Sequence, residues 1–216
     1  MKKNSSKTFP VNLAIWLWMA WLLSWTVFIW SGWFPKDRFT WYLEVAPGFL
    51  GLIFAGKFLR SDKITPLLFV LICIHSVILF VGGKYTYAEV PIGFWLKEFF
   101  EMSRNHYDRL GHFIQGFEPA ILAREILIRW QAVKRGFWLN FFVVSVCLAF
   151  SAFYELIEWW TALLSGEGAQ AFLGTQGDIW DTQTDMFLAL IGAATALVFL
   201  SRWHDRQLQG SSNVRK

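Results

Sequence analysis

Two pairs of residues at helical spacing carry side chains that could do chemistry in this chain. Asp108 and His112 are four residues apart, and Glu155 and Glu158 are three residues apart. On a helix, each pair would project from one face, one turn above the other. A carboxylate beside an imidazole is a suitable metal-binding pair, and a second carboxylate pair can add ligands or a general base.

A third acidic stretch has the same spacing. Asp178, Asp181 and Asp185 are separated by three and four residues, and with the two pairs they supply six carboxylates and one imidazole. So many like charges out of bulk water are unfavourable unless protons or a cation neutralise them. We therefore predict a bound divalent cation, namely Mg, Mn, Ca or Zn. The predicted metal ligands are Asp108, His112, Glu155, Asp178 and Asp181, and the predicted catalytic residues are Asp185 and the general base Glu158.

Structural roles compete with this prediction. Asp178 could cap the helix that follows it, and the helix dipole would then favour Asp181 in the first turn. Asp108 could likewise begin its helix or pair with a nearby arginine. Glu155 and Glu158 could be ordinary carboxylates at a membrane interface. Their helix would end close to them, however, and the dipole disfavours anions at that end.

Composition shows what kind of elements must position these residues. The chain of 216 residues is 55% hydrophobic and 17% charged, below the roughly 25% that is typical of soluble proteins. Residues 11–33 contain no Asp, Glu, Lys or Arg and would form a helix of about 34 Å, enough to cross a bilayer. The chain is therefore an integral membrane protein with membrane lipids as partners. Its basic residues lie between apolar runs rather than along one stripe, so we expect no nucleic-acid partner.

The apolar runs predict an all-α membrane bundle in a single domain, residues 1–206, followed by a polar tail, residues 207–216. Six transmembrane helices are expected, at about residues 11–33, 39–58, 64–83, 108–130, 136–160 and 183–203. The fourth of these carries many charges, so hydropathy alone is a weak guide to it. Between the third and fourth, Phe94, Trp95 and Phe99 alternate with Lys97 and Glu98, which is typical of a short interfacial helix.

The loop charges predict the orientation. Segments on the same side as the N-terminus carry most of the Lys and Arg residues, which favours both termini in the cytoplasm. With six spans, the three acidic stretches all lie at the other face, and Glu44 near the start of the second span lies there too. This placement does not depend on the absolute orientation.

Four motifs resemble those of the YjdF-type bacterial inner-membrane proteins. They are residues 85–91 (YTYAEVP), 104–113 (RNHYDRLGHF), 154–159 (YELIEW) and 176–186 (QGDIWDTQTDM). The resemblance covers nearly the whole chain and implies a multi-pass protein of the bacterial inner membrane. It supplies no mechanism, because that family is functionally uncharacterised. The layout of an Asp and a His ahead of a span, with acidic residues later, is also similar to that of VanZ-like membrane proteins.

Three functions fit these observations. The first is a metal-dependent enzyme that hydrolyses or transfers a phosphoryl or acyl group on a lipid or lipid-linked substrate. The second is a cation-binding or transport protein, in which Glu118 and His75 mark a path deeper into the membrane. The third is a non-catalytic scaffold whose acidic residues only close helix ends. A polar path across the membrane would favour transport, and a closed pocket would favour an enzyme.

Overall fold

The computed structural model describes residues 10–59, 61, 63–165 and 175–210, and the regular secondary structure within them is entirely helical. The α-helices are α1 (Val11–Gly32), α2 (Arg38–Gly56), α3 (Pro66–Tyr85), α4 (Pro91–Phe99), α5 (Tyr107–Arg129), α6 (Phe137–Ser165) and α8 (Asp181–Gly210), with a 3-10 helix, η1 (Tyr87–Glu89), before α4. Five helices in the described residues, α1, α2, α3, α6 and α8, are long and apolar enough to cross a membrane. The predicted all-α membrane bundle is confirmed.

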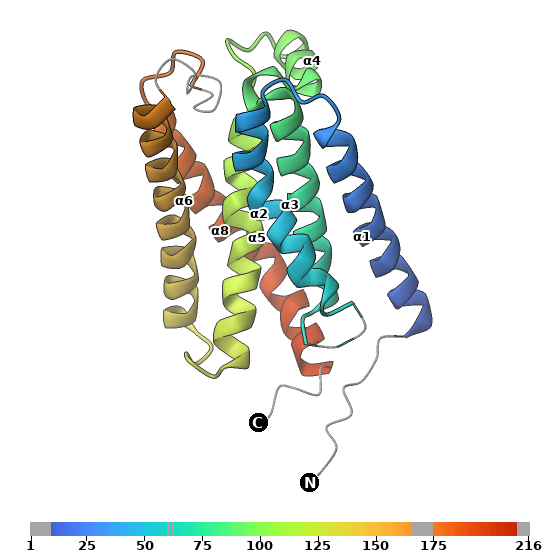
Figure 1. Ribbon diagram of the computed structural model, residues 1–216. Helices are drawn as coiled ribbons and strands as arrows, with labels where there is room; N and C mark the ends of the chain where they lie inside the picture. The colour runs from blue at the N-terminus through green and yellow to red at the C-terminus, as the bar shows by residue number, and fades with distance from the viewer. Residues whose placement is uncertain (1–9, 60, 62, 166–174, 211–216) are drawn as a thin grey trace.

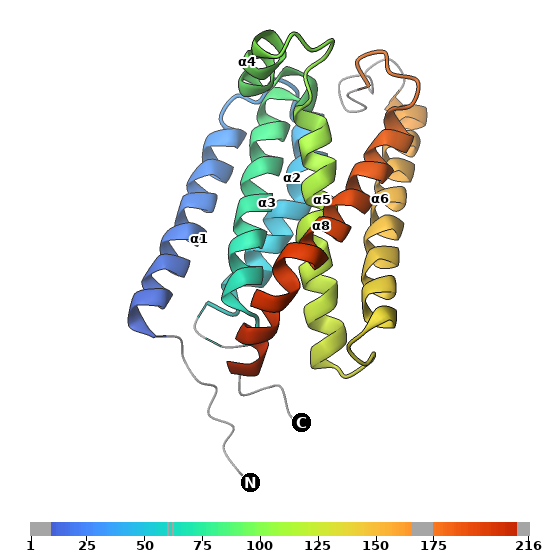
Figure 2. The ribbon, with the colours of Figure 1, turned by 180° about the vertical axis from the view of Figure 1, so that it is seen from behind.

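The helices run alternately up and down, and the start of α1 and the end of α8 lie at the same end of the bundle (Figure 1). We call the other end, which contains α4 and the starts of α5 and α8, the α4 end. Helix α5 lies within the bundle and packs against α8, α6 and α3, while α3 also packs against α1 and α2. In Figure 2, which views the bundle from behind, α8 crosses obliquely in front of α5.

Local sequence signals explain where several helices begin and end. The Asp37 side chain accepts a hydrogen bond from the Thr40 backbone N–H at 2.6 Å and caps α2. Helix α3 has Thr65 as its cap, with Pro66 at the first helical position, where proline is favoured. Helix α8 continues to Gly210, into the segment that we predicted as a polar tail. The Gln207 side chain accepts from the Leu67 backbone N–H there, and residues 211–216 lie outside the described residues.

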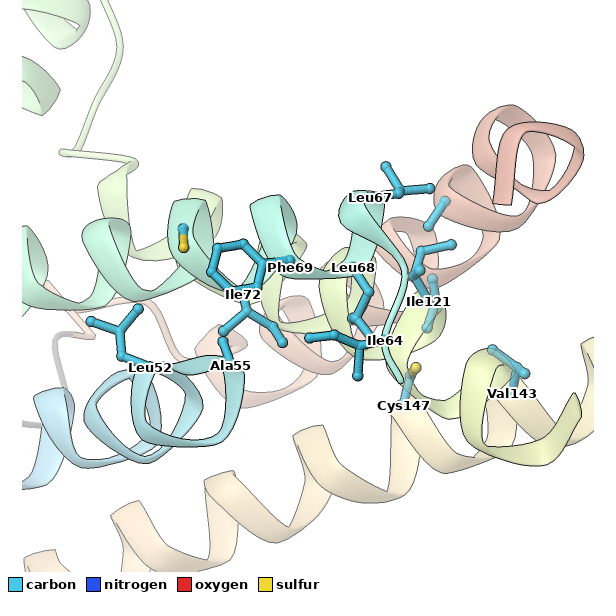
Figure 3. Packing of buried hydrophobic residues seen from close by; sticks show 14 of the residues in the cluster. Leu52, Ala55, Ile64, Leu67, Leu68, Phe69, Ile72, Ile121, Val143 and Cys147 are labelled. Carbon is cyan, nitrogen blue, oxygen red and sulfur yellow. The ribbon is translucent and has the colours of Figure 1, made fainter. Parts of the chain in front are cut away.

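The apolar core joins α2, α3, α5 and α6 (Figure 3). Leu52, Phe69, Ile121 and Val143 represent these four helices, and each is at most 1% exposed. Cys147 and Cys73 are both buried and free, so they act as small packing residues. Large aromatic side chains are exposed along α1 and α6, which is the surface that a lipid bilayer would cover.

Helices α5 and α8 cross at very short range. A Cβ atom at Gly116 would lie 1.8 Å from the Ala189 carbonyl oxygen, and one at Gly192 would lie 2.0 Å from the Phe113 carbonyl oxygen. A side chain at either position would overlap the backbone of the facing helix, so only glycine fits there. Small residues of this kind allow two membrane helices to approach closely. This crossing brings the start of α8 beside the start of α5, where the predicted site residues lie.

A second polar network closes the opposite end of the bundle. His204 is fully buried and contacts Glu125 through Nε2 at 2.9 Å. Arg124 donates to His204 Nδ1 at 2.9 Å and to Asp205 at 2.8 Å. Glu125 also accepts from the Thr65 backbone N–H. Because both acidic groups have basic partners, this network ties α3, α5 and α8 together and leaves no carboxylate for a ligand.

Candidate functional site

His112 lies at the centre of a buried acidic cluster at the α4 end. Its Nε2 atom is 3.6 Å from Asp108 Oδ1 and 3.9 Å from Asp185 Oδ2, and its Nδ1 atom is 3.8 Å from Glu155 Oε1. All four side chains are at most 11% exposed. Helices α5, α6 and α8 therefore bring residues from all three predicted acidic stretches together.

The tautomer of His112 follows from its neighbour Gln115. The Gln115 Oε1 atom lies 2.9 Å from His112 Nδ1, and a carbonyl oxygen can only accept a hydrogen bond. His112 Nδ1 therefore donates to Gln115, and Nε2 faces Asp108 and Asp185. The distances from Nε2 to the two carboxylates exceed the 2.7–3.2 Å range of a hydrogen bond. Either a proton on Nε2 or a cation between Nε2 and the two carboxylates would balance their charge.

Two carboxylate oxygens in the cluster are buried without a hydrogen-bond partner. They are Asp185 Oδ1 and Glu155 Oε1. Two groups of side chains place one ligand atom each within 4.8 Å of one another, and His112 belongs to both. One group contains Asp108 and Asp185, and the other contains Glu155 and Glu158. The buried side chains could therefore hold a metal ion.

Arg104 neutralises part of the cluster from its outer rim. Its guanidinium lies 2.5 Å from Asp181 Oδ1, 3.4 Å from Asp178 Oδ2 and 3.9 Å from Asp108 Oδ2. Asp178 also accepts from Arg109 at 2.9 Å. The structure therefore places two of the predicted ligands, Asp178 and Asp181, against arginine, and neither belongs to the two groups around His112.

Asp178 and His106 lie just outside the helices at this rim. The Trp180 backbone N–H donates to Asp178, and this bond, together with the Arg104 and Arg109 charges, lowers the pKa of Asp178. Burial lowers the pKa of His106, and Arg109 and Arg104 lower that pKa further. Both effects favour the neutral ring, whose Nδ1 accepts from Arg109 at 3.2 Å.

Asn105 fastens the rim to two other segments. Its backbone N–H donates to Gln176 Oε1 at 3.1 Å, and Gln176 Nε2 donates back to the Asn105 carbonyl at 2.8 Å. The Asn105 side chain donates to the Val90 carbonyl, and a Cβ at Gly93 in α4 would lie 1.8 Å from its Oδ1 atom. Helix α4 and the segment before α8 are thus held against the start of α5.

The structure adds two residues to the cluster. Glu44 from α2 is buried and accepts from the Tyr154 hydroxyl at 3.1 Å. Glu44 lies close enough to Asp108 and His112 for direct electrostatic interaction. The predicted topology had already placed Glu44 at this face. Tyr154 could not be singled out, although it directly precedes Glu155 in the chain.

A separate ionisable pair lies farther along α5. His75 Nδ1 of α3 is 3.0 Å from Glu118 Oε2, and the Glu118 side chain is 8% exposed. The other polar atom of each side chain, His75 Nε2 and Glu118 Oε1, is buried without a hydrogen-bond partner. The structure confines this pair to the interior between the two polar ends.

Fold and site together define a polytopic α-helical membrane protein with a buried carboxylate and histidine cluster at one end. The chain belongs to the family described as "Predicted membrane protein (DUF2238)", whose model matches residues 16–206. It is also 52% identical to the Inner membrane protein YjdF of Escherichia coli (strain K12) over 183 residues, which cover 85% of this chain and 88% of that protein. The resemblance to the YjdF-type proteins is therefore confirmed, and the chain is a multi-pass inner-membrane protein. No solved structure matches the chain significantly.

Proposed function

We propose that this protein binds a divalent cation through Asp108, His112 and Asp185 and uses it to act on a lipid or lipid-linked substrate. The observation that carries the proposal is the orientation of His112. Its Nδ1 bonds to Gln115 Oε1, and its Nε2 faces two carboxylates. Metal-binding histidines commonly have such a partner on the other ring nitrogen, because that bond fixes the tautomer and the ring orientation.

The spacing of the candidate ligand atoms supports this proposal. Ligands about 2.0–2.2 Å from a tetrahedral metal are roughly 3.4 Å apart. The separations of 3.6 Å and 3.9 Å around His112 Nε2 are close to that value and too long for hydrogen bonds. One imidazole with two carboxylates suits Zn or Mn, and Mg or Ca would need more oxygen ligands.

The neighbouring carboxylates supply the groups that a hydrolytic or transfer reaction needs. A bound divalent cation would polarise a phosphoryl or acyl oxygen or make water a stronger acid. Glu158, which is buried beside Glu155, is placed to accept a proton from a nucleophile. Arg104 holds Asp181 and contacts Asp108, so it orients the rim of the site.

We infer that α5 is a sixth membrane span and that both termini are cytoplasmic. Helix α5 is 23 residues long and lies alongside the five apolar helices, although its charges lower its hydropathy. Its buried residues include Asp108, Glu118 and Glu125, so these charges face other helices and not lipid. With this orientation the cluster lies at the outer side of the inner membrane, and a substrate would enter from the outer leaflet.

Elemental analysis of the detergent-purified protein tests the proposal. Wild-type protein should retain about one divalent metal or more per chain, and the Asp108→Asn, His112→Ala double variant should lose it. The Glu98→Gln, Glu101→Gln variant is a matched control, because both carboxylates are exposed and neither belongs to the two ligand groups around His112. If wild-type protein binds no Mg, Mn or Zn after loading, the metal-dependent function is wrong.

A second candidate function, cation transport, is favoured by the His75–Glu118 pair. The pair lies between the acidic cluster and the network at the opposite end, so ionisable groups occur on α5 at both ends and between them. Buried charges at such depth commonly mark ion paths. A flux assay in proteoliposomes separates the two functions, since an enzyme needs no ion flux across the membrane.

A further inference from the structure

We infer that the cluster holds a second divalent cation at Glu155 and Glu158, beside the one at Asp108, His112 and Asp185. This inference rests on the proposed function, because it assumes the first cation, and it makes Glu158 a metal ligand instead of the general base. Glu155 and Glu158 lie on α6, one turn apart, and form their own ligand group with His112. Glu155 Oε1 has no hydrogen-bond partner, its side chain is 6% exposed, and it points toward His112 at 3.8 Å.

Charge balance is the first argument for a second cation. Six carboxylates are buried at the α4 end, namely Glu44, Asp108, Glu155, Glu158, Asp181 and Asp185. The buried basic side chains of the described residues at this end are Arg104 and His112, since Arg124 and His204 belong to the network at the opposite end. Arg104 lies closest to Asp181.

Two of the six buried carboxylates have partners outside the ligand groups of His112. Glu44 accepts from Tyr154, and Asp181 is paired with Arg104. Four carboxylates then surround His112, those of Asp108, Asp185, Glu155 and Glu158. When all four are ionised, one divalent cation balances half of their charge and a second cation balances the rest.

The protein atoms that are available at the second subsite indicate which cation it would hold. Gln115 already occupies His112 Nδ1, and Nε2 faces the first subsite. The second cation would therefore have two carboxylates from the protein, with its other positions filled by water or substrate oxygens. That arrangement is typical of Mg²⁺, which is bound by one or two carboxylates together with substrate phosphates.

A site with two cations suits a substrate with a phosphoryl group better than one with an acyl group. Paired metal sites are common in phosphatases and nucleases, where they stabilise the attacking and leaving oxygens of a phosphoryl transfer. The substrate class that fits this subsite is therefore a phosphate-bearing lipid. Arg104 and Arg109 stand at the rim, where a phosphate would enter past Asp178.

Titration of the full-length, chelator-treated protein with Mn²⁺ in detergent tests the inference. Wild-type protein should bind about two Mn²⁺ per chain, and the Glu155→Gln, Glu158→Gln variant should bind about one. The single Glu158→Gln variant should weaken only the second binding step, and it serves if the double variant does not fold. The exposed pair Glu98→Gln, Glu101→Gln should leave both binding steps unchanged.

The outcomes separate the two proposals. One Mn²⁺ in wild-type protein, unchanged in the Glu155→Gln, Glu158→Gln variant, would overturn the second subsite and leave the first intact. No Mn²⁺ in either protein would overturn the proposed function as well. Inorganic phosphate should tighten the second Mn²⁺ in wild-type protein more than sulfate does, and equal effects of the two anions would overturn the phosphoryl substrate class.

Discussion

At the residue scale, the orientation of His112 decides what the acidic cluster can bind. Gln115 Oε1 bonds to Nδ1, so Nε2 is the ring nitrogen that faces Asp108 and Asp185. Without Gln115, the imidazole could carry its proton on Nε2 and donate it to either carboxylate. A single amide oxygen therefore separates a metal ligand from an ordinary buried histidine.

Substitution of Gln115 tests this role. Gln115→Leu removes the acceptor, and loss of such a partner typically weakens metal binding by about 10–100-fold. Gln115→Glu keeps an oxygen acceptor and should restore most of the affinity. Gln183→Leu, an exposed substitution in α8, is the control. Titration of the chelator-treated protein with Mn²⁺ measures the change, and equal affinity in the Gln115→Leu variant and wild type would show that Gln115 does not set the tautomer.

At the element scale, the crossing of α5 and α8 builds the site. Gly116 and Gly192 allow backbone contact between the helices, and this contact places Asp185 within 3.9 Å of His112. Helix α6 contributes Glu155 from the third side. The three helices thus bring residues as far apart in the chain as Asp108 and Asp185 into one cluster.

Enlarging Gly192 should therefore damage both the fold and the site. The Gly192→Ala methyl would overlap the Phe113 carbonyl oxygen, a backbone atom that cannot turn aside. We expect the free energy of unfolding to fall by about 3 kcal/mol, the upper end of the range for overpacking, or by more. Metal binding should become weaker as well. Gly210→Ala is the control, because a Cβ there meets nothing within 4 Å. The melting temperature in detergent measures the effect, and an unchanged value for Gly192→Ala would contradict the close crossing.

At the scale of the whole molecule, the acidic cluster and the Glu125–His204 network lie at opposite ends of one bundle. The charges of the cluster exceed their basic partners, while the network at the opposite end is balanced by Arg124 and Arg129. The two ends therefore have different roles, one suited to a ligand and the other to holding helices together. Helix α5, the proposed sixth span, connects the two ends.

Cysteine labelling tests that topology. Ser103→Cys lies before α5 at the α4 end, and Lys134→Cys follows α5 at the opposite end; both positions are exposed. The native Cys73 and Cys147 are buried and should give little background. A membrane-impermeant maleimide should label the Ser103→Cys variant in spheroplasts, and the Lys134→Cys variant only after the membrane is permeabilised. Labelling of both from the same side would show that α5 does not span the membrane, and the reverse pattern would invert the orientation.

The sequence by itself determined the membrane class, the approximate ends of the long helices and the presence of α4. These follow from local periodicity and from runs of apolar residues, which need no tertiary contacts to be seen. Helical spacing also showed that Asp108 and His112 share a face, as do Glu155 and Glu158. The charged helix α5 was harder to recognise, because its polar residues face its neighbours and lower its hydropathy.

Only the tertiary structure decided which of these residues meet. It directed Asp181 and Asp178 to Arg104, joined Asp185 to His112, and placed Glu44 of α2 against Tyr154 of α6. The rotation of each helix about its axis and the distance between helices depend on packing, such as the contact at Gly192. Spacing within one helix contains no information about that packing, so the sequence predicted the candidate residues but not their partners.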